Sequence, residues 1–349
     1  MRPPALKELE AFSAAIGADP EQVQAAGGNT SVKEAGLLWV KASGLWLADA
    51  EKRDIFVPVA LEQVLDGIGA SAADPVSAAV VAALNPEGLR PSIETTLHAL
   101  LPHRIVVHTH SVRTLALAIR EDGEARIAER LLDLRWAWIP YCKPGLPLTR
   151  EVAARLAAGP ADVLVLGNHG LVVGAATVPE AAALLAEVER RLDAPVQPAA
   201  DGTRAPLAAL AQALGLREPV HPAAHALAMN RLRLERAVTG SLYPDHVIFL
   251  GPAATGLPAG ADAPELAAAV AAATERGGKL FLVPGAGALL AAGTTASADE
   301  LALCLALVLE RVPDGAALRC LRPEDEAELL DWDAEKYRQS LARTRAARA

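Results

Sequence analysis

The sequence contains few cysteines, and their spacing matches neither a metal-binding pattern nor a disulfide framework. Only three occur in 349 residues, at Cys142, Cys304 and Cys320. The chain therefore has no Cys-x-x-Cys pair of the kind that builds structural zinc sites. A sparse, odd number of cysteines fits a reducing cytoplasm better than a disulfide-stabilised secreted protein. We expect ordinary buried thiols and a cytoplasmic location.

The chain also lacks a charge-free apolar run of about 18 or more residues, so no membrane span is expected. Its N-terminal segment lacks the apolar core of a signal peptide. Basic residues are fewer than acidic ones, 33 against 42, and the formal net charge is −9. Because nucleic-acid backbones need a basic protein face, nucleic acid is not expected as a partner. Hydrophobic residues make up 52% of the chain, enough for the core of one large domain or two.

The segment Pro91 to Ser111 holds a glutamate and two closely spaced histidines. Glu94 stands at an expected helix start, and His108 and His110 lie on an apolar strand. Alternate strand residues point to one face, so these two imidazoles lie about 6 to 7 Å apart along the strand. Such a pair can share a divalent cation if a third ligand comes from elsewhere, and His169, between two apolar runs, is the candidate. A histidine in an apolar run is more often a packed core residue, so a structural role stays open at this point.

Four short motifs follow one another along the first half of the chain. They are GGNTSVK (27–33), PSIET (91–95), HTH (108–110) and NHG (168–170). In this order they resemble the class II aldolase/adducin family over roughly residues 5 to 195. The sequences of these motifs are most similar to the aldolase part of bacterial rhamnulose-1-phosphate aldolase/short-chain dehydrogenase fusions. After an aldolase part of this size, residues up to Ala349 are too few for a complete Rossmann domain, so no second one is expected.

The resemblance implies a role for each residue of the cluster. His108, His110 and His169 would bind Zn²⁺ or another divalent metal, and Glu94 would be the acid/base residue close to that metal. Tyr141, in IPYCKPG, matches a tyrosine that acts as proton donor in a neighbouring subunit's site. Anchoring of a loop is the alternative role for this tyrosine. Action across subunits requires a homo-oligomer, for which the family norm is a tetramer.

The resemblance also implies an anion-binding loop, although two positions depart from the family pattern. Ala26 stands where the family has a threonine, and Ile93 replaces a serine. Lys33 and Lys41 either supply compensating charge or are solvated surface residues. Small residues allow backbone N–H groups to approach an anion closely. The residues that match the family's substrate- and phosphate-binding positions are Gly28, Asn29, Ser43, Gly44 and Ser92.

The resemblance, together with these residues, implies a metal-dependent aldolase with a small sugar or sugar phosphate as its substrate. It would cleave a ketose phosphate or related hydroxyketone into dihydroxyacetone phosphate, or an analogue, and a short aldehyde. Cleavage requires stabilisation of an enediolate, which a zinc-type Lewis acid provides, and three neutral histidines leave the ion its full charge. The alternatives are a sugar-phosphate epimerase, decarboxylase or dehydratase, or a non-catalytic adducin-like module. Glu94 favours the aldolase over the epimerase, and the three histidines argue against the non-catalytic module.

Alternating strands and helices predict an α/β fold. We expect a class II aldolase-like αβα sandwich with a central sheet over residues 1–195, then a linker over 194–206. A smaller C-terminal α/β unit of unknown role is expected over 207–349. Expected strands of the first part are 37–43, 55–60, 104–110, 136–141, 163–167 and 171–175, and its helices 5–17, 95–101, 125–134, 149–158 and 178–192. In the second part we expect helices at 207–215, 222–236, 265–277 and 297–311, and strands at 246–250, 279–285 and 288–293.

Overall fold

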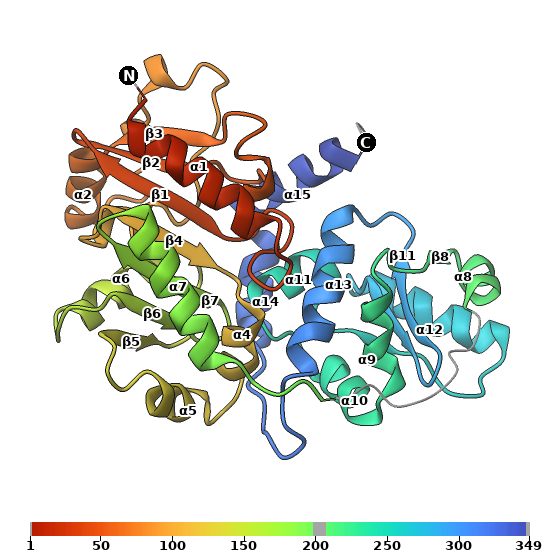
Figure 1. Cartoon of the computed structure of the whole chain (residues 1–349). Helices are drawn as coiled ribbons and strands as arrows, with labels where there is room; N and C mark the ends of the chain where they lie inside the picture. Colours follow the sequence, from red (N-terminus) through yellow and green to blue (C-terminus); the bar gives the residue numbers. More distant parts are fainter. Residues whose placement is uncertain (1, 198–206, 347–349) are drawn as a thin grey trace. The chain divides into compact units, whose positions relative to one another are not determined.

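A seven-stranded sheet forms the centre of the first half of the chain. The computed structural model describes residues 2–197 and 207–346, which divide into two units (Figure 1). The first unit comprises residues 1–114 and 124–193, and the second comprises 115–123 and 194–349. Residues 198–206 of the expected linker lie outside the described residues.

The sheet of the first unit has the strand order β3-β2-β1-β4-β7-β6-β5. Neighbouring strands are antiparallel except for the parallel pair β5 and β6. The central strand β4 pairs with β1 on one side and β7 on the other. The strands are β1 (Asn29–Glu34), β2 (Leu37–Lys41), β3 (Phe56–Ala60), β4 (Ile105–Thr109), β5 (Trp136–Ile139), β6 (Val163–Leu166) and β7 (Gly170–Ala175).

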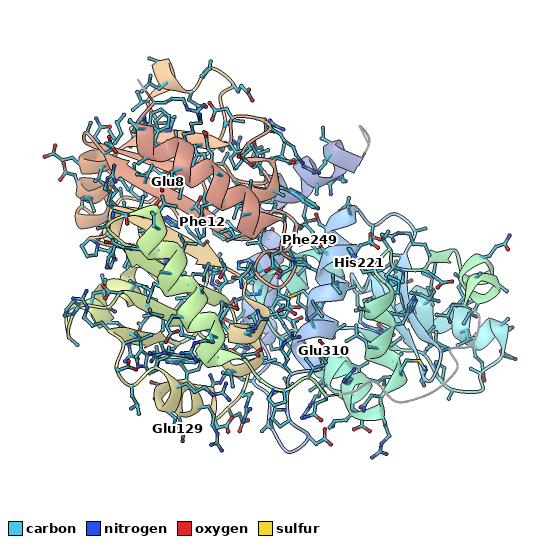
Figure 2. All side chains as sticks on the ribbon, in the orientation of Figure 1. Glu8, Phe12, Glu129, His221, Phe249 and Glu310 are labelled. Atoms are coloured by element: carbon cyan, nitrogen blue, oxygen red, sulfur yellow. The ribbon has the colours of Figure 1, made fainter. Side chains whose placement is uncertain are left out.

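Helices cover both faces of this sheet, as predicted for an αβα sandwich. Helices α1 (Pro4–Gly17) and α7 (Val178–Leu192) contact each other and cover one face, and α2 (Leu61–Gly69), α3 (Thr95–Leu100) and α6 (Leu146–Leu156) cover the other (Figure 1). Amphipathic patterning drives this packing, since α1 buries Leu6 and Leu9 while Glu8 is exposed (Figure 2). The remaining helices are α4 (Val112–Ala118), α5 (Gly123–Arg130) and the 3₁₀ turns η1 (Leu47–Asp49), η2 (Ser77–Ala79) and η3 (Ala82–Leu84).

The second unit is the predicted smaller α/β unit. Its sheet has the order β8-β11-β10-β9, with β9 and β10 parallel and the other neighbours antiparallel. Phe281 and Leu289 pack with Leu207 and Val270 in its core. The strands are β8 (Leu216–Arg217), β9 (Thr255–Gly256), β10 (Leu280–Val283) and β11 (Gly287–Ala291). The helices are α8 (Ala208–Leu214), η4 (Pro222–His225), α9 (Ala226–Met229), α10 (Arg231–Thr239), α11 (Pro244–Leu250), α12 (Ala263–Glu275), α13 (Ala296–Leu309), α14 (Pro323–Asp331) and α15 (Asp333–Ala346).

The strand predicted at His246–Leu250 is wrong, because this segment forms helix α11. All seven residues of α11 are buried, and a short apolar run buried on every side has no periodicity that separates helix from strand. Pro244 at the first helical turn and Gly251, with φ 90°, mark the two helix ends.

The single helix predicted over 222–236 is also wrong. Asn230 adopts an extended conformation (φ −121°, ψ 127°), which separates η4 and α9 from α10. Its side chain accepts a hydrogen bond from the Arg233 N–H at 3.1 Å and so caps α10. A good N-cap residue therefore starts a new helix where the apolar pattern alone indicated continuity.

Strand β1 was not predicted, because its sequence NTSVKE is largely polar. Its position between β2 and β4 buries these polar side chains, which then require partners. Thr30 shares a hydrogen bond of 2.7 Å with Ser13, and Ser31 shares one of 2.7 Å with His98. The partners come from α1 and α3, which no local pattern reveals.

Candidate metal centre

Three histidines converge at one end of the central sheet. His108 lies on β4, His110 directly follows that strand, and His169 lies in the turn between β6 and β7. Their side-chain ligand atoms all lie within 4.8 Å of one another, and the ring centroids are 5.0 to 5.4 Å apart. All three residues are buried. Across residues 2–197 and 207–346, no other group of three His, Cys, Asp or Glu residues has such a geometry.

Backbone pairing positions His108 and His169 beside each other. In the turn that carries His169, Asn168 has φ 54°, a left-handed conformation that asparagine tolerates better than most residues. His108 Nδ1 donates a hydrogen bond of 3.0 Å to the Leu171 carbonyl of the neighbouring strand β7. This bond orients the ring, so that Nε2 is the atom of His108 that could bind a metal.

Glu94 lies against two of the three histidines, at the N-cap position of α3. Its Oε2 is 3.3 Å from His108 Nε2, and its Oε1 is 3.6 Å from His169 Nε2. The Asn29 amide donates a hydrogen bond of 2.8 Å to Oε2. Burial alone would raise the pKa of Glu94, but positive charge on the neighbouring histidines and the Asn29 hydrogen bond lower it to about 2. The carboxylate is therefore ionised at neutral pH.

Tertiary pairing brings Asn29 to this position from a distant part of the sequence. Asn29 begins β1 and stands opposite His108 in the β1–β4 register. Gly28 precedes it with φ 59°, and a Cβ added at Gly28 would lie 2.8 Å from the His108 carbonyl oxygen. Glycine at this position therefore permits both the turn and the close approach to β4.

The residues expected to bind an anion lie on backbone segments joined through Lys41. The Lys41 ammonium is buried and donates hydrogen bonds to the carbonyls of Ala26 at 2.8 Å and Gly28 at 2.9 Å. The Lys41 carbonyl accepts from the Ser92 N–H at 2.9 Å, and the Ser43 N–H donates to the Arg90 carbonyl at 2.8 Å. These bonds place the Ser43 and Ser92 segments side by side, next to the loop that ends at Gly28.

Two further contacts connect this region to the carboxylate. The Ser92 hydroxyl accepts a hydrogen bond from the Glu94 N–H at 3.2 Å, and Gly44 continues the turn after Ser43 with φ 74°. Lys33, in contrast, lies four residues after Asn29, about 13 Å along β1. Its ammonium donates to the Leu101 carbonyl, so Lys41 and not Lys33 is next to the loop that ends at Gly28.

Tyr141 lies in the loop that follows the edge strand β5. Because β6 and β7 separate β5 from β4, strand spacing places this loop about 14 Å from β4. Its predicted role as proton donor in a neighbouring subunit's site stays a prediction.

Two supporting residues surround the cluster. His98 shares its Nδ1 hydrogen bond with Ser31, and burial lowers its pKa to about 3, so it stays neutral. Gln24 was not predicted, and its Nε2 donates to the His110 carbonyl at 3.4 Å and to the Pro20 carbonyl at 2.7 Å. No sequence pattern marks Gln24, because its contact depends on the fold of the loop before β1.

The donor set fits a divalent metal. Three neutral imidazoles with a nearby carboxylate are ligands that zinc and similar ions accept, and they leave coordination positions for other oxygens. The residues that would hold the ion are His108, His110 and His169, with Glu94 adjacent.

No helix in the described ranges is long and apolar enough to cross a membrane.

Comparison with known proteins gives three informative matches. The sequence profile of the family described as "Class II Aldolase and Adducin N-terminal domain" matches residues 10–194. "Uncharacterized oxidoreductase YuxG" of Bacillus subtilis is 33% identical in an alignment of 188 residues, which covers 49% of this chain but only 26% of that protein. "L-fuculose phosphate aldolase" of Methanococcus vannielii is 26% identical over 47% of this chain and 80% of its own length.

Among solved structures, the N-terminal class II aldolase domain of a Thermoplasma acidophilum protein is 28% identical. The match covers 55% of this chain and 93% of that chain, with a TM-score of 0.46. The family match at residues 10–194 lies in the first unit except for residues 115–123, and the match to YuxG covers 26% of that oxidoreductase.

Proposed function

The chain belongs to the class II aldolase and adducin family, and on that premise we propose that it is a metal-dependent aldolase. Its substrate would be a ketose phosphate or related hydroxyketone, cleaved into dihydroxyacetone phosphate, or an analogue, and a short aldehyde. The observation that carries the proposal is the buried cluster of His108, His110 and His169 with Glu94 beside it.

The three histidines would hold Zn²⁺ or another divalent cation. When bound, such an ion acts as a Lewis acid toward the negative charge that cleavage generates on the substrate oxygens. His108 is held in place for this role by its bond to the Leu171 carbonyl. As metal ligands the imidazoles would be neutral, so they would leave the charge of the ion intact.

Glu94 is the proposed proton carrier. Its ionised carboxylate accepts the proton of the substrate hydroxyl whose oxygen becomes the aldehyde oxygen. As the carbon–carbon bond breaks, the electron pair passes to the ketone fragment, and Glu94 returns the proton to that carbon. Asn29 holds the carboxylate in one orientation, and Tyr141 of a neighbouring copy would donate a hydrogen bond to the aldehyde oxygen.

We propose that a substrate phosphate binds where the loop that ends at Gly28 lies next to the segments of Ser43 and Ser92. Lys41 supports this proposal, because its buried ammonium donates a hydrogen bond to the Gly28 carbonyl. This charge offsets the loss of the two hydroxyls that Ala26 and Ile93 replace. The proposed phosphate-binding residues are Gly28, Asn29, Ser43, Gly44 and Ser92.

The decisive experiment combines metal analysis with a cleavage assay on rhamnulose and fuculose phosphates, before and after chelation. We expect near-stoichiometric metal and chelator-sensitive cleavage. His110→Ala should lose both metal and activity, whereas Glu94→Ala should lose turnover and keep most of the metal. His103→Ala is the matched control, because His103 bonds Asp162 at 2.9 Å outside the cluster. Bound metal without cleavage would favour an epimerase, decarboxylase or dehydratase, and the absence of metal would refute the proposal.

A complementation experiment tests the role of Tyr141. Glu94→Ala and Tyr141→Phe subunits are each expected to be inactive, but a mixed oligomer contains sites with one native Glu94 and a native Tyr141 from the neighbour. Random equal mixing should restore about a quarter of the native sites. If Tyr141 acts within its own subunit, or not at all, mixing restores nothing beyond the sum of the two variants.

A further inference from the structure

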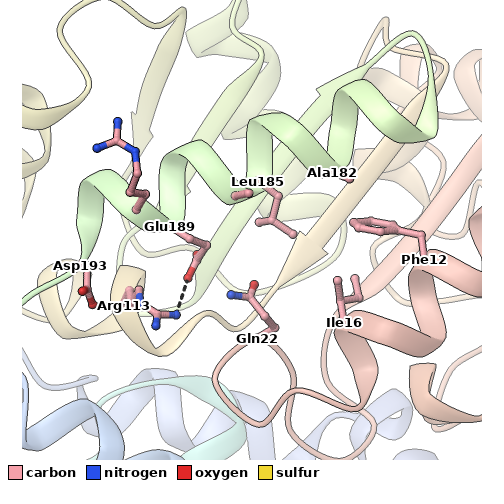
Figure 3. A pocket seen from close by; sticks show the side chains of 10 residues that line it. Phe12, Ile16, Gln22, Arg113, Ala182, Leu185, Glu189 and Asp193 are labelled. Carbon is pink, nitrogen blue, oxygen red and sulfur yellow. Dashed lines mark hydrogen bonds and ion pairs between the residues drawn. The ribbon is translucent and has the colours of Figure 1, made fainter.

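Two cavities, one in each unit, differ in the charges that line them. The larger, of about 460 Å³, lies between α1 and α7 in the first unit (Figure 3). Arg113 and Arg190 line it together with Glu189 and Asp193, and Arg113 lies 3.5 Å from the Glu189 carboxylate and 3.0 Å from that of Asp193. The charges of the two signs are balanced there, so this cavity favours a ligand of neither sign.

The smaller cavity, of about 160 Å³, lies in the second unit and has cations as its charged lining. It is formed by α11, the start of β10, the turn between β11 and α13, and α15. Its volume is below the range of most small-molecule sites, about 300 to 1,000 Å³, so it admits an ion or one end of a larger molecule. Lys279 and Arg343 line it, and the described residues around it include no carboxylate.

Lys279 brings a partly buried positive charge to this cavity. Its ammonium donates a hydrogen bond of 2.9 Å to the Ile248 carbonyl, which uses one of the three donors of an ammonium group. Burial and the nearby positive charge of Arg343 both lower the pKa of Lys279, and no carboxylate in the described part of the chain offsets them. The other two N–H groups of Lys279 therefore suit an anion.

Arg343 adds a second positive charge from α15. Its side chain is exposed, and no carboxylate of the described ranges lies within ion-pair distance of its guanidinium. Other cations of the same helix are paired, since Arg338 lies 3.0 Å from the Asp245 carboxylate and Lys336 lies 2.7 Å from that of Asp331. Two cations that share a cavity without an acidic partner repel each other, and an anion between them would remove this repulsion.

Thr295, the N-cap residue of α13, adds an uncharged donor to the lining. Its side chain makes no capping hydrogen bond, so its hydroxyl group can donate to a ligand. The Thr294 hydroxyl, in contrast, already donates to the Ala291 carbonyl at 2.7 Å. The first N–H groups of a helix lack intrahelical acceptors, so the start of α13 adds to the preference for negative charge but does not establish it.

We propose that this cavity binds a phosphate group, either as the free ion or as the end of a phosphomonoester. Lys279 and Arg343 would face the nearly two negative charges of the phosphate, and the Thr295 hydroxyl would donate to one of its oxygens. A carboxylate would leave one of the two cations uncompensated, and a cation would be repelled by both. The proposal does not rest on the aldolase activity, because the cavity includes no residue of the metal cluster.

The test is calorimetric titration of the full chain with inorganic phosphate. Arg343→Gln and Lys279→Gln should each weaken one phosphate-binding event at least about tenfold, as the loss of a charge-assisted hydrogen bond implies. Arg345→Gln is the matched control, because it removes the same charge from α15 outside the cavity, and it should bind phosphate as the native chain does. Since Arg343 is exposed, its variant should keep the native thermal unfolding profile even if Lys279→Gln is less stable.

Absence of phosphate binding to the native chain would overturn the proposal. Native phosphate binding in Arg343→Gln, or an equal loss in Arg343→Gln and Arg345→Gln, would overturn it as well. The same would follow if acetate bound as tightly as phosphate at the site that Arg343→Gln weakens. Tighter binding of glycerol 3-phosphate than of inorganic phosphate at that site would identify a phosphomonoester as the ligand, and the reverse order would identify the free ion.

A second readout separates this site from the proposed substrate site of the first unit. Phosphate that binds at the substrate site should inhibit aldol cleavage equally in the native chain and in Arg343→Gln. Calorimetry requires no turnover, so failure of the aldolase proposal would leave the phosphate titration unaffected. A changed inhibition constant in Arg343→Gln would show that the phosphate acts at the substrate site and would refute a separate site.

Discussion

Replacement of Gly28 by alanine tests whether the loop before β1 must approach strand β4 as closely as the structure shows. Gly28 has φ 59°, and an added Cβ would lie 2.8 Å from the His108 carbonyl oxygen and 3.1 Å from a Val23 methyl group. Gly36, in the two-residue turn between β1 and β2, has φ 77° and no atom within 4 Å of an added Cβ. Gly36→Ala is therefore a matched control that changes the backbone preference alone.

The two effects have separable magnitudes. A left-handed conformation costs an alanine about 1 to 2 kcal/mol, and both variants incur this cost. Gly28→Ala adds the forced displacement of a packed segment, about 1 to 3 kcal/mol. We therefore expect Gly36→Ala to lose about 1 to 2 kcal/mol and Gly28→Ala about 2 to 5 kcal/mol of unfolding free energy.

Urea unfolding followed by tryptophan fluorescence measures this difference in the first unit. Four of the five tryptophans lie there, and they are Trp39, Trp46, Trp136 and Trp138. A zinc titration provides the second readout, because the added Cβ would displace the carbonyl group of His108 itself. We expect weaker zinc binding in Gly28→Ala and native binding in Gly36→Ala.

Equal destabilisation of the two variants would show that the loop can move away from β4 without a loss of unfolding free energy. Native zinc affinity in Gly28→Ala would show that the position of His108 does not depend on the loop. Either result would refute the inference that the Gly27–Gly28 motif is required by its contact with β4.

Three other predictions concern stability. Arg338→Met leaves the buried carboxylates of Asp245 and Glu335 without their cation and should lower the unfolding free energy by about 3 to 5 kcal/mol. Lys336→Met removes an exposed ion pair and should lower the unfolding free energy, measured with urea, by at most about 1 kcal/mol. Burial lowers the pKa of His246 from 6.5 to about 4, so the unfolded chain binds a proton first as the pH falls. Stability should therefore drop by roughly 3 kcal/mol between pH 6.5 and 4, and His246→Gln should reduce that drop in unfolding measured across this range. Zinc at about 100 times its dissociation constant should add about 2.7 kcal/mol; chelation should reverse this gain, and His110→Ala should show neither effect.

The ligand types and several of their local positions follow from the sequence. The spacing of His108 and His110 on an apolar strand depends only on strand geometry, and the structure brings both into one cluster with His169. The Asn168–Gly170 motif forms the expected turn because Asn168 tolerates the left-handed backbone that the turn needs. The alternation of helices and strands likewise predicted the αβα sandwich, because most of its elements carry their own apolar pattern.

Patterns failed where burial was decided by distant residues. Strand β1 is polar, and it is a central strand because Ser13 and His98 satisfy its hydroxyl groups. Helix α11 is apolar on all sides, so its sequence does not distinguish a helix from a buried strand. In both cases the partners belong to other elements of the fold, and no local signal specifies them.

Convergence of the site is likewise a tertiary result. Sequence alone named Glu94, Asn29 and Lys41 as candidates, but it did not establish that Asn29 orients Glu94 or that Lys41 is buried behind Gly28. The pairing of β1 with β4 produces the first contact, and the buried position of Lys41 at the end of β2 produces the second. Residue chemistry and local geometry are properties of short segments and can be predicted from them, whereas contacts between segments 65 residues apart exist only once the sheet has formed.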